Sequence, residues 1–190
     1  MTTLQANHRV RAQLLRKVSA STDLSKTMRK AVSVLPEANI PSLVVGGYAV
    51  QENGYARFSS DVDLVVPDVA AAREVLSING FRENPGSSMT VTDGHWTVNL
   101  FAGGYQAGRG PLKYPMPIRV SKQPKIASLR ALIETKLSIY LGSTTLGMQD
   151  FSDVIELMKW NQMPRCFALD PRVSAKFTET WDLLQAENAR

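Results

Sequence analysis

The segment GGYAVQENGYARFSSDVDL, residues 46–64, combines a glycine pair with two closely spaced acids. Gly46 and Gly47 are followed, after thirteen residues, by Asp61 and Asp63 at the head of the valine-rich run DVDLVVP. In a strand, residues i and i+2 face the same side with their Cβ atoms about 7 Å apart. The pattern therefore predicts a strand with two carboxylates on one face and an apolar opposite face.

Two carboxylates at this spacing repel each other, and a hard divalent cation is the usual way to make such a pair favourable. Mg²⁺ or Mn²⁺ takes oxygen ligands and keeps open positions for substrate phosphates. The alternative is an exposed strand face on which Asp61 and Asp63 are simply solvated, although aspartate is depleted in strands. We expect a metal site formed by the two aspartates.

The glycines and the residues just before the acids suggest phosphate binding. Gly46 and Gly47 have no side chains to block a triphosphate, and the NH groups of a following helix can receive phosphate oxygens. Arg57 and Ser60 could steady phosphates or orient Asp61. Their alternative interpretation is an ordinary surface loop.

Hydrophobic periodicity and turn residues indicate helices, strands and a helical carboxy-terminal part. The expected fold class is α+β (α/β), with a small mixed sheet flanked by helices and with amino- and carboxy-terminal helical segments. We expect helices over 9–20, 22–35, 48–53, 69–79, 128–141, 150–160 and 172–186, and strands over 42–45, 61–66, 88–92, 95–101 and 116–120. The pattern divides into 1–36, a core over 37–122, and 123–190, within one compact unit.

Composition excludes several classes of protein. The chain has 190 residues, of which 44% are hydrophobic, and a single cysteine, Cys166. A lone cysteine excludes an internal disulfide framework, no run approaches eighteen apolar residues, and the amino terminus lacks the apolar segment of a signal peptide. We expect a soluble cytoplasmic protein without a membrane partner.

Positive charge gathers at the amino terminus. Residues 1–35 hold seven Lys and Arg against one acid, Asp23, in a chain of net charge +5. Such a patch could meet RNA, tRNA or DNA, and a nucleic-acid-binding module that works without the two aspartates is a third, weaker hypothesis. A solvated helix face is the ordinary explanation.

The order Gly46-Gly47, thirteen residues, Asp61-Val62-Asp63-Leu64 resembles the signature of the nucleotidyltransferase superfamily typified by DNA polymerase β. More narrowly, GGYAV...ARFSSDVDLVV is similar to small bacterial nucleotidyltransferases grouped with the AbiEii toxins and the drug-modifying adenylyltransferases. The resemblance covers roughly residues 40–160. It implies that Asp61 and Asp63 bind the metals carrying a nucleoside triphosphate, that the glycines cradle its phosphates, and that a nucleotidyl group passes to an acceptor hydroxyl. A toxin-antitoxin role would depend on a partner that one chain does not reveal.

The carboxy-terminal half contributes two further candidates. Lys136 falls in the middle of the apolar stripe of helix 128–141, so either it snorkels outward or its charge points to an anion such as the triphosphate. The segment also resembles the family's helical region, in which such a lysine precedes a downstream aspartate matched by Asp150. Asp150 could equally cap its helix.

One position departs from the family pattern. Catalytic members usually carry a third carboxylate on a later strand, where HWTVNLF offers Asn99. An amide is not a base at neutral pH, so His95 is an alternative base and Asp93 the nearest acid, though Asp93-Gly94 is more simply a hairpin turn. Two main hypotheses remain: a metal-dependent enzyme transferring an NMP group from an NTP to an RNA end, a protein or a small molecule, and a catalytically silent protein that binds nucleotide or a partner.

Overall fold

The computed structural model describes residues 23–84 and 86–188. The helix expected over 9–20 and four of the amino-terminal cations, Arg9, Arg11, Arg16 and Lys17, lie outside these residues.

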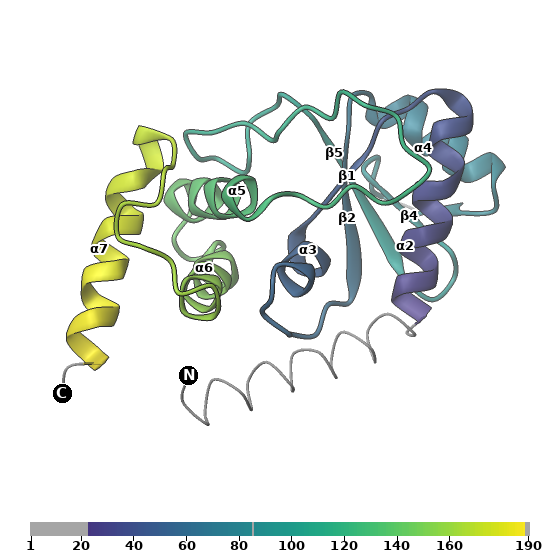
Figure 1. Cartoon of the computed structure of the whole chain (residues 1–190). Helices are drawn as coiled ribbons and strands as arrows, with labels where there is room; N and C mark the ends of the chain where they lie inside the picture. The colour runs from purple at the N-terminus through teal and green to yellow at the C-terminus, as the bar shows by residue number, and fades with distance from the viewer. Residues whose placement is uncertain (1–22, 85, 189–190) are drawn as a thin grey trace.

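A five-stranded sheet forms the centre of the molecule (Figure 1). Its order is β1-β2-β5-β4-β3, with β2 and β5 parallel and the other neighbouring pairs antiparallel. The sheet is therefore mixed, and the expected α+β class is confirmed. The strands are β1 (Leu43–Val45), β2 (Asp61–Val66), β3 (Arg82–Glu83), β4 (Thr90–Thr92) and β5 (Thr97–Ala102).

The strand expected over 116–120 is wrong, because these residues belong to a long loop, 103–127. Pro115 and Pro117 have no NH to donate to a ladder, which disfavours pairing on both sides of Met116. The fifth strand is instead β3, which consists of two exposed residues and pairs with β4 at the edge of the sheet opposite β1. So short a strand carries no alternating pattern that a sequence could reveal.

The other expected helices are present with boundaries shifted by a few residues. The short helix after the first strand begins directly at Gly46, with no separate turn before it. Asp68 and Ser128 cap their helices by accepting from the backbone NH of Ala71 and Ala131. The helices are α2 (Asp23–Val34), the 3-10 helix η1 (Leu35–Ala38), α3 (Gly46–Glu52), α4 (Val69–Ile78), α5 (Leu129–Gly142), α6 (Met148–Trp160) and α7 (Pro171–Asn188).

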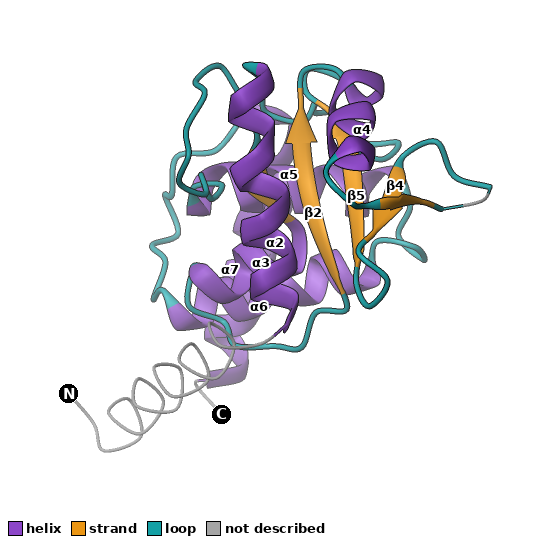
Figure 2. Cartoon of the chain, turned by 90° about the vertical axis from the view of Figure 1, so that its right-hand side faces the viewer, coloured by secondary structure: helices purple, strands orange, loops and turns teal. Residues whose placement is uncertain are grey.

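Alternation along β2 separates the two faces of the sheet. Val62, Leu64 and Val66 are fully buried in a core that also contains residues of α2 and α4, while Val65 belongs to a smaller cluster with Ala127. Figure 2 shows β2, β5 and β4 together with the helices around them. Asp61 and Asp63 share the face of Val65, opposite the larger core.

A second core joins α3 to the carboxy-terminal helices α5, α6 and α7, which lie on the other side of α3 from α2 in Figure 1. Ala49 and Val50 of α3 belong to this core, together with Leu132, Leu137 and eight other buried residues. The helix that follows the glycine pair is thus packed against the carboxy-terminal helices. Among the described residues, no helix has the length and apolar character needed to cross a membrane.

Candidate active site

Two adjacent parallel strands bring the acids and the amide together. In the register of β2 and β5, Asp63 lies opposite Asn99. The Asn99 Nδ2 group donates to Asp61 Oδ2 at 3.2 Å and to Asp63 Oδ1 at 2.8 Å. Asn99 therefore bridges both carboxylates, at the position where the family pattern predicts a third acid.

The environment of Asp63 disfavours the ionised form of its carboxyl group. Burial raises the pKa of Asp63 to about 6, and the neighbouring carboxylate of Asp61 acts in the same direction. The hydrogen bond from Asn99 and the positive charge of Lys136 oppose this shift without cancelling it. A cation that contacted both carboxylates would relieve the repulsion and favour the ionised form.

The two glycines are required by close packing. Gly46 has φ +63°, and a Cβ on it would lie 1.7 Å from Asp63 Oδ2. A Cβ on Gly47 would lie 2.5 Å from the Ser59 hydroxyl oxygen. The start of α3 therefore lies directly against Asp63, which only a residue without a side chain allows.

A serine other than the expected one contacts the acids. Ser60 is exposed, whereas Ser59 is buried and its hydroxyl lies 3.2 Å from the Asp61 carbonyl oxygen and 3.3 Å from Asp61 Oδ1. Sequence reasoning missed Ser59. Its separation of two residues from Asp61 was the available signal, since side chains two apart in extended chain face the same side.

A buried ion-pair network lies beside this site. Lys136 is almost fully buried, and its Nζ lies 2.7 Å from Asp150 Oδ1 and 2.8 Å from Asp153 Oδ2. Arg57 Nε lies 2.8 Å from Asp153 Oδ1. Lys136 thus joins α5 to α6, and Arg57 links the segment before β2 to the same aspartate.

Asp150 does not cap its helix, so that interpretation of the sequence is wrong. The residue before α6 is Gly147, which has no side chain to cap the helix, and Asp150 is the third helical residue, where its carboxylate accepts from Lys136. Asp153 was absent from the sequence-based candidates. Its position three residues after Asp150, on the face of buried Val154 and Leu157, was the signal for a partner.

His95 and Asp93 lie in the hairpin connection that precedes β5. Asp93 accepts from the backbone NH groups of His95 and Trp96 and from the Thr27 hydroxyl. Burial raises the pKa of Asp93, but these bonds outweigh it and lower the pKa overall. Asp93 is therefore a turn acid, as the simpler interpretation predicted, while the role of the exposed His95 as an alternative base stays a prediction.

Tyr114 was absent from the sequence-based candidates. Its ring stacks on that of Phe101, with the centroids 5.0 Å apart. Burial raises the pKa of its hydroxyl, and the negative charges of Asp63 and Asp150 raise it further. Tyr114 therefore carries loop 103–127 to within electrostatic reach of both acids.

The donor set suits one hard divalent cation with open positions. No cluster of three His, Cys, Asp or Glu side chains with metal-binding geometry occurs within residues 23–84 and 86–188. Asp61 and Asp63 supply carboxylate oxygens, and rotation of the Asn99 amide about its last bond would present its oxygen in place of the nitrogen. Mg²⁺ is commonly held by one or two carboxylates plus substrate phosphates, so these residues fit it.

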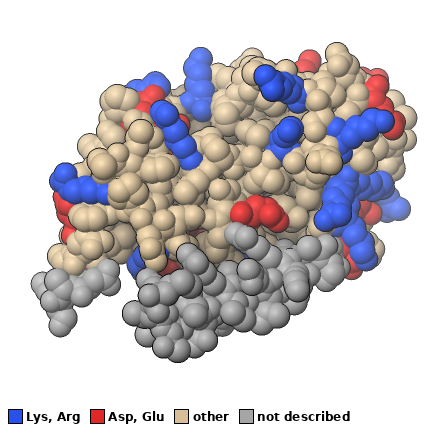
Figure 3. Space-filling view, viewed as in Figure 1, with Lys and Arg blue, Asp and Glu red and all other residues tan. Residues whose placement is uncertain are grey.

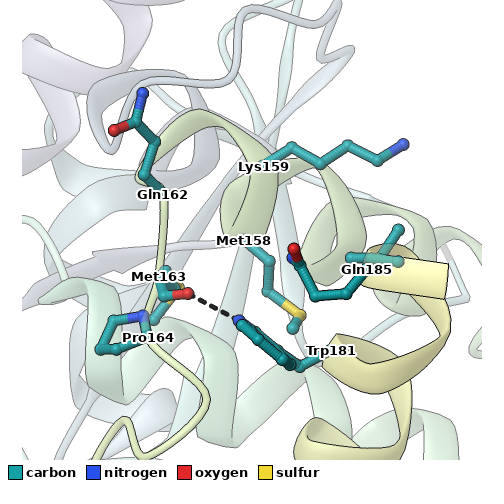
Figure 4. A pocket seen from close by; sticks show the side chains of 8 residues that line it. Met158, Lys159, Gln162, Met163, Pro164, Trp181 and Gln185 are labelled. Carbon is teal, nitrogen blue, oxygen red and sulfur yellow. Dashed lines mark hydrogen bonds between the residues drawn. The ribbon is translucent and has the colours of Figure 1, made fainter. Parts of the chain in front are cut away.

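A separate cavity of about 620 Å³ lies between the end of α6 and α7 (Figure 4). Met158, Met163, Trp181 and Leu184 line it, and Trp181 Nε1 donates to the Met163 carbonyl at 2.9 Å. Neither Asp61 nor Asp63 lines this cavity. It is therefore distinct from the carboxylate site.

Comparison with known proteins supports the fold. No family model matches the chain, and no curated protein matches it. A crystal structure of ANT(2'')-Ia in complex with adenylyl-2''-tobramycin is similar with TM-score 0.51 and 12% identity, over 88% of this chain and 99% of that one. A solution structure of the same antibiotic-resistance factor gives TM-score 0.49 and 12% identity, over 88% and 97%. The chain thus shares the fold of ANT(2'')-Ia.

Proposed function

We propose that this protein is a metal-dependent nucleotidyltransferase, which transfers an NMP group from an NTP to an acceptor hydroxyl. The observation that carries the proposal is the convergence of Asp61, Asp63 and Asn99 on adjacent strands, with the Gly46 backbone packed against Asp63. Two repelling carboxylates in a partly buried position call for a cation. The fold shared with ANT(2'')-Ia, whose structure holds an adenylylated product, supports this assignment.

The chain's own residues divide the work in this proposal. Asp61 and Asp63 would hold Mg²⁺ or Mn²⁺, which when bound stabilises charge on the transferring phosphoryl group and on the leaving pyrophosphate. Ser59 orients the Asp61 carboxylate, because its hydroxyl lies beside Oδ1 of that residue. The bare backbone at Gly46 and Gly47 lets the start of α3 lie directly against Asp63 and Ser59, beside the acids that would hold the cation.

The ion-pair network has a positioning role in the same proposal. Lys136 is engaged by Asp150 and Asp153. Its positive charge also acts on Asp63, whose pKa it lowers. Arg57 lies on the other side of Asp153 and is also close to Gly47. Holding α5, α6 and the start of α3 in one arrangement would fix the position of the acids relative to the phosphates of the bound substrate.

A second candidate function rests on Asn99. Its amide replaces the acid that would withdraw a proton from the acceptor, and at present it donates to both aspartates. A protein that binds a nucleoside triphosphate without transferring its nucleotidyl group would fit this substitution. Such a protein would still need the glycine turn and the acid pair.

Label transfer distinguishes the two functions. Purified protein is incubated with each α-³²P-labelled NTP, Mg²⁺ or Mn²⁺, and RNA, protein and small-molecule acceptors. Transfer that disappears in Asp63→Ala and persists in the matched control Asp68→Ala, an exposed helix cap, supports the enzyme. Tight metal-dependent NTP binding without transfer to any acceptor supports the silent binder. If the protein shows no NTP binding and no transfer, both functions are refuted.

A further inference from the structure

The loop 103–127 is the most one-sidedly charged part of the described chain. It contains five cations and no acid: Arg109, Lys113, Arg119, Lys122 and Lys125. Residues 23–84 and 86–188 together hold 17 Lys and Arg and 17 Asp and Glu, so the rest of the described chain is net acidic. Figure 3 shows Lys and Arg side chains spread over the upper part of the face that this loop crosses in Figure 1.

All five cations are available to a partner. Each is exposed, and none forms an ion pair with a side chain in the part of the chain that the structure describes. The cations nearest the acids differ, since Arg57 and Lys136 are already held by Asp153. The five loop cations therefore remain free to pair with an anion.

Apolar side chains lie between these charges. Tyr105 is 71% exposed and Ile118 is 81% exposed, and Met116 and Val120 are exposed as well. A chain that alternates phosphates with flat bases would match cations alternating with apolar groups. A small anion would instead favour cations converging on one point, whereas these are distributed along twenty-five residues of loop.

The loop is held in place and reaches the acids. Its first part forms a short hairpin in which Tyr114 N donates to the Tyr105 carbonyl, and Leu112 N donates to Ser138 Oγ of α5. Its last part is fixed to β1, where Val44 N donates to the Lys125 carbonyl at 2.7 Å. Between these anchors Tyr114 is partly buried, stacks on Phe101 and lies within electrostatic reach of Asp63. The loop that carries the exposed cations thus approaches the site at Tyr114.

We propose that loop 103–127 is the acceptor-binding surface and that the acceptor is a single-stranded nucleic acid, whose terminal hydroxyl reaches the site of Asp61 and Asp63. The identification of this strand as acceptor rests on the proposed transferase function. A polycationic acceptor such as an aminoglycoside is disfavoured, because five unpaired positive charges would repel it.

The test measures fluorescence anisotropy of a labelled twelve-nucleotide RNA, and of DNA of the same sequence, across a salt series. Arg119→Gln/Lys122→Gln removes two loop charges. The matched control, Arg29→Gln/Arg82→Gln, removes two exposed arginines. Arg29 belongs to the basic patch of residues 1–35. We expect the loop variant to flatten the slope of log K against log salt by about 1.4, because each phosphate contact to a single strand contributes about −0.7.

The outcomes separate this inference from the proposed function. RNA binding that survives Asp63→Ala, weakens in the loop variant and is unchanged in the control supports the surface. No binding, equal effects of both variants, or full competition by inorganic tripolyphosphate at matched charge would overturn it. Binding at the loop with no label transferred to the bound strand or to any other acceptor refutes the transferase function and leaves the binding surface standing. Label transferred to another acceptor but not to the bound strand refutes the strand as acceptor, and transfer to a neutral small molecule without RNA binding refutes the loop assignment alone.

Discussion

Replacing Lys136 by methionine should destabilise the protein more than any other removal of a single Lys charge from α5 or α6. The side chain of Lys136 is 4% exposed and that of Asp153 is fully buried, so the substitution leaves an acid in the interior with one of its two cations removed. Methionine preserves most of the apolar stem. The loss therefore reports on charge rather than on a cavity.

The magnitude follows from the contacts. Breaking a buried ion pair by removing one partner costs about 3–5 kcal/mol. Arg57 stays beside Asp153, and Asp150 is 23% exposed and can be hydrated, so we expect the lower end of that range. For a chain of this size, 1 kcal/mol lowers Tm by about 2–4 °C, which gives a decrease of about 6–12 °C.

Urea unfolding monitored by far-UV circular dichroism measures the change, with thermal unfolding as a second readout. The matched control is Lys159→Met on α6, since Lys159 pairs with Glu156 at the surface, with side chains 49% and 30% exposed. Surface pairs contribute about 0–1 kcal/mol, so the control should unfold almost as the parent does. Equal unfolding midpoints for the two variants would refute the claim that Lys136 stabilises the junction of α5 and α6.

Three further predictions concern the acid site. Gly46→Ala should lower the free energy of unfolding in urea more than Gly94→Ala does. Both residues have positive φ, where a side chain adds a strain of about 1–2 kcal/mol, but only at Gly46 would the new Cβ meet Asp63. Equal losses of stability in the two variants would contradict the close packing at Gly46. The pKa of Asp63 rises from 3.8 to about 6 on folding, so the folded state binds more protons between these values and the metal-free wild type should lose up to about 3 kcal/mol of stability as pH rises from 4 to 6. In EDTA, Asp63→Asn should lack that part of the loss, and parallel pH profiles would contradict the assignment. Asn99→Asp should tighten Mn²⁺ binding measured by calorimetry and lower metal-free stability, because it adds a third carboxylate to the pair; unchanged Mn²⁺ affinity would argue against a cation at this position.

Features that depend on residues close in the chain could be predicted from sequence. The alternation in DVDLVV placed Asp61 and Asp63 on one face, and α2, α4, α5, α6 and α7 followed from apolar spacing. These are properties of a strand period of two and a helix period of 3.6, which local sequence specifies. The position of Lys136 within its apolar stripe was visible in the same way and suggested an anion, for which the triphosphate was expected. The anions that Lys136 meets in the structure are Asp150 and Asp153.

The partners of these residues were decided by tertiary structure. Asn99 is separated from Asp61 by 38 residues and Arg57 from Asp153 by 96, and no periodicity relates residues so far apart. The parallel register of β2 and β5 brings the first pair together, and the packing of α6 the second. The same limit explains why Tyr114 was missed. Ser59 and the false strand at 116–120 are different, because the spacing of Ser59 from Asp61 and the prolines beside Met116 were local signals. Local pattern determines which way a side chain faces along its own element, whereas only the packing of elements determines what it meets there.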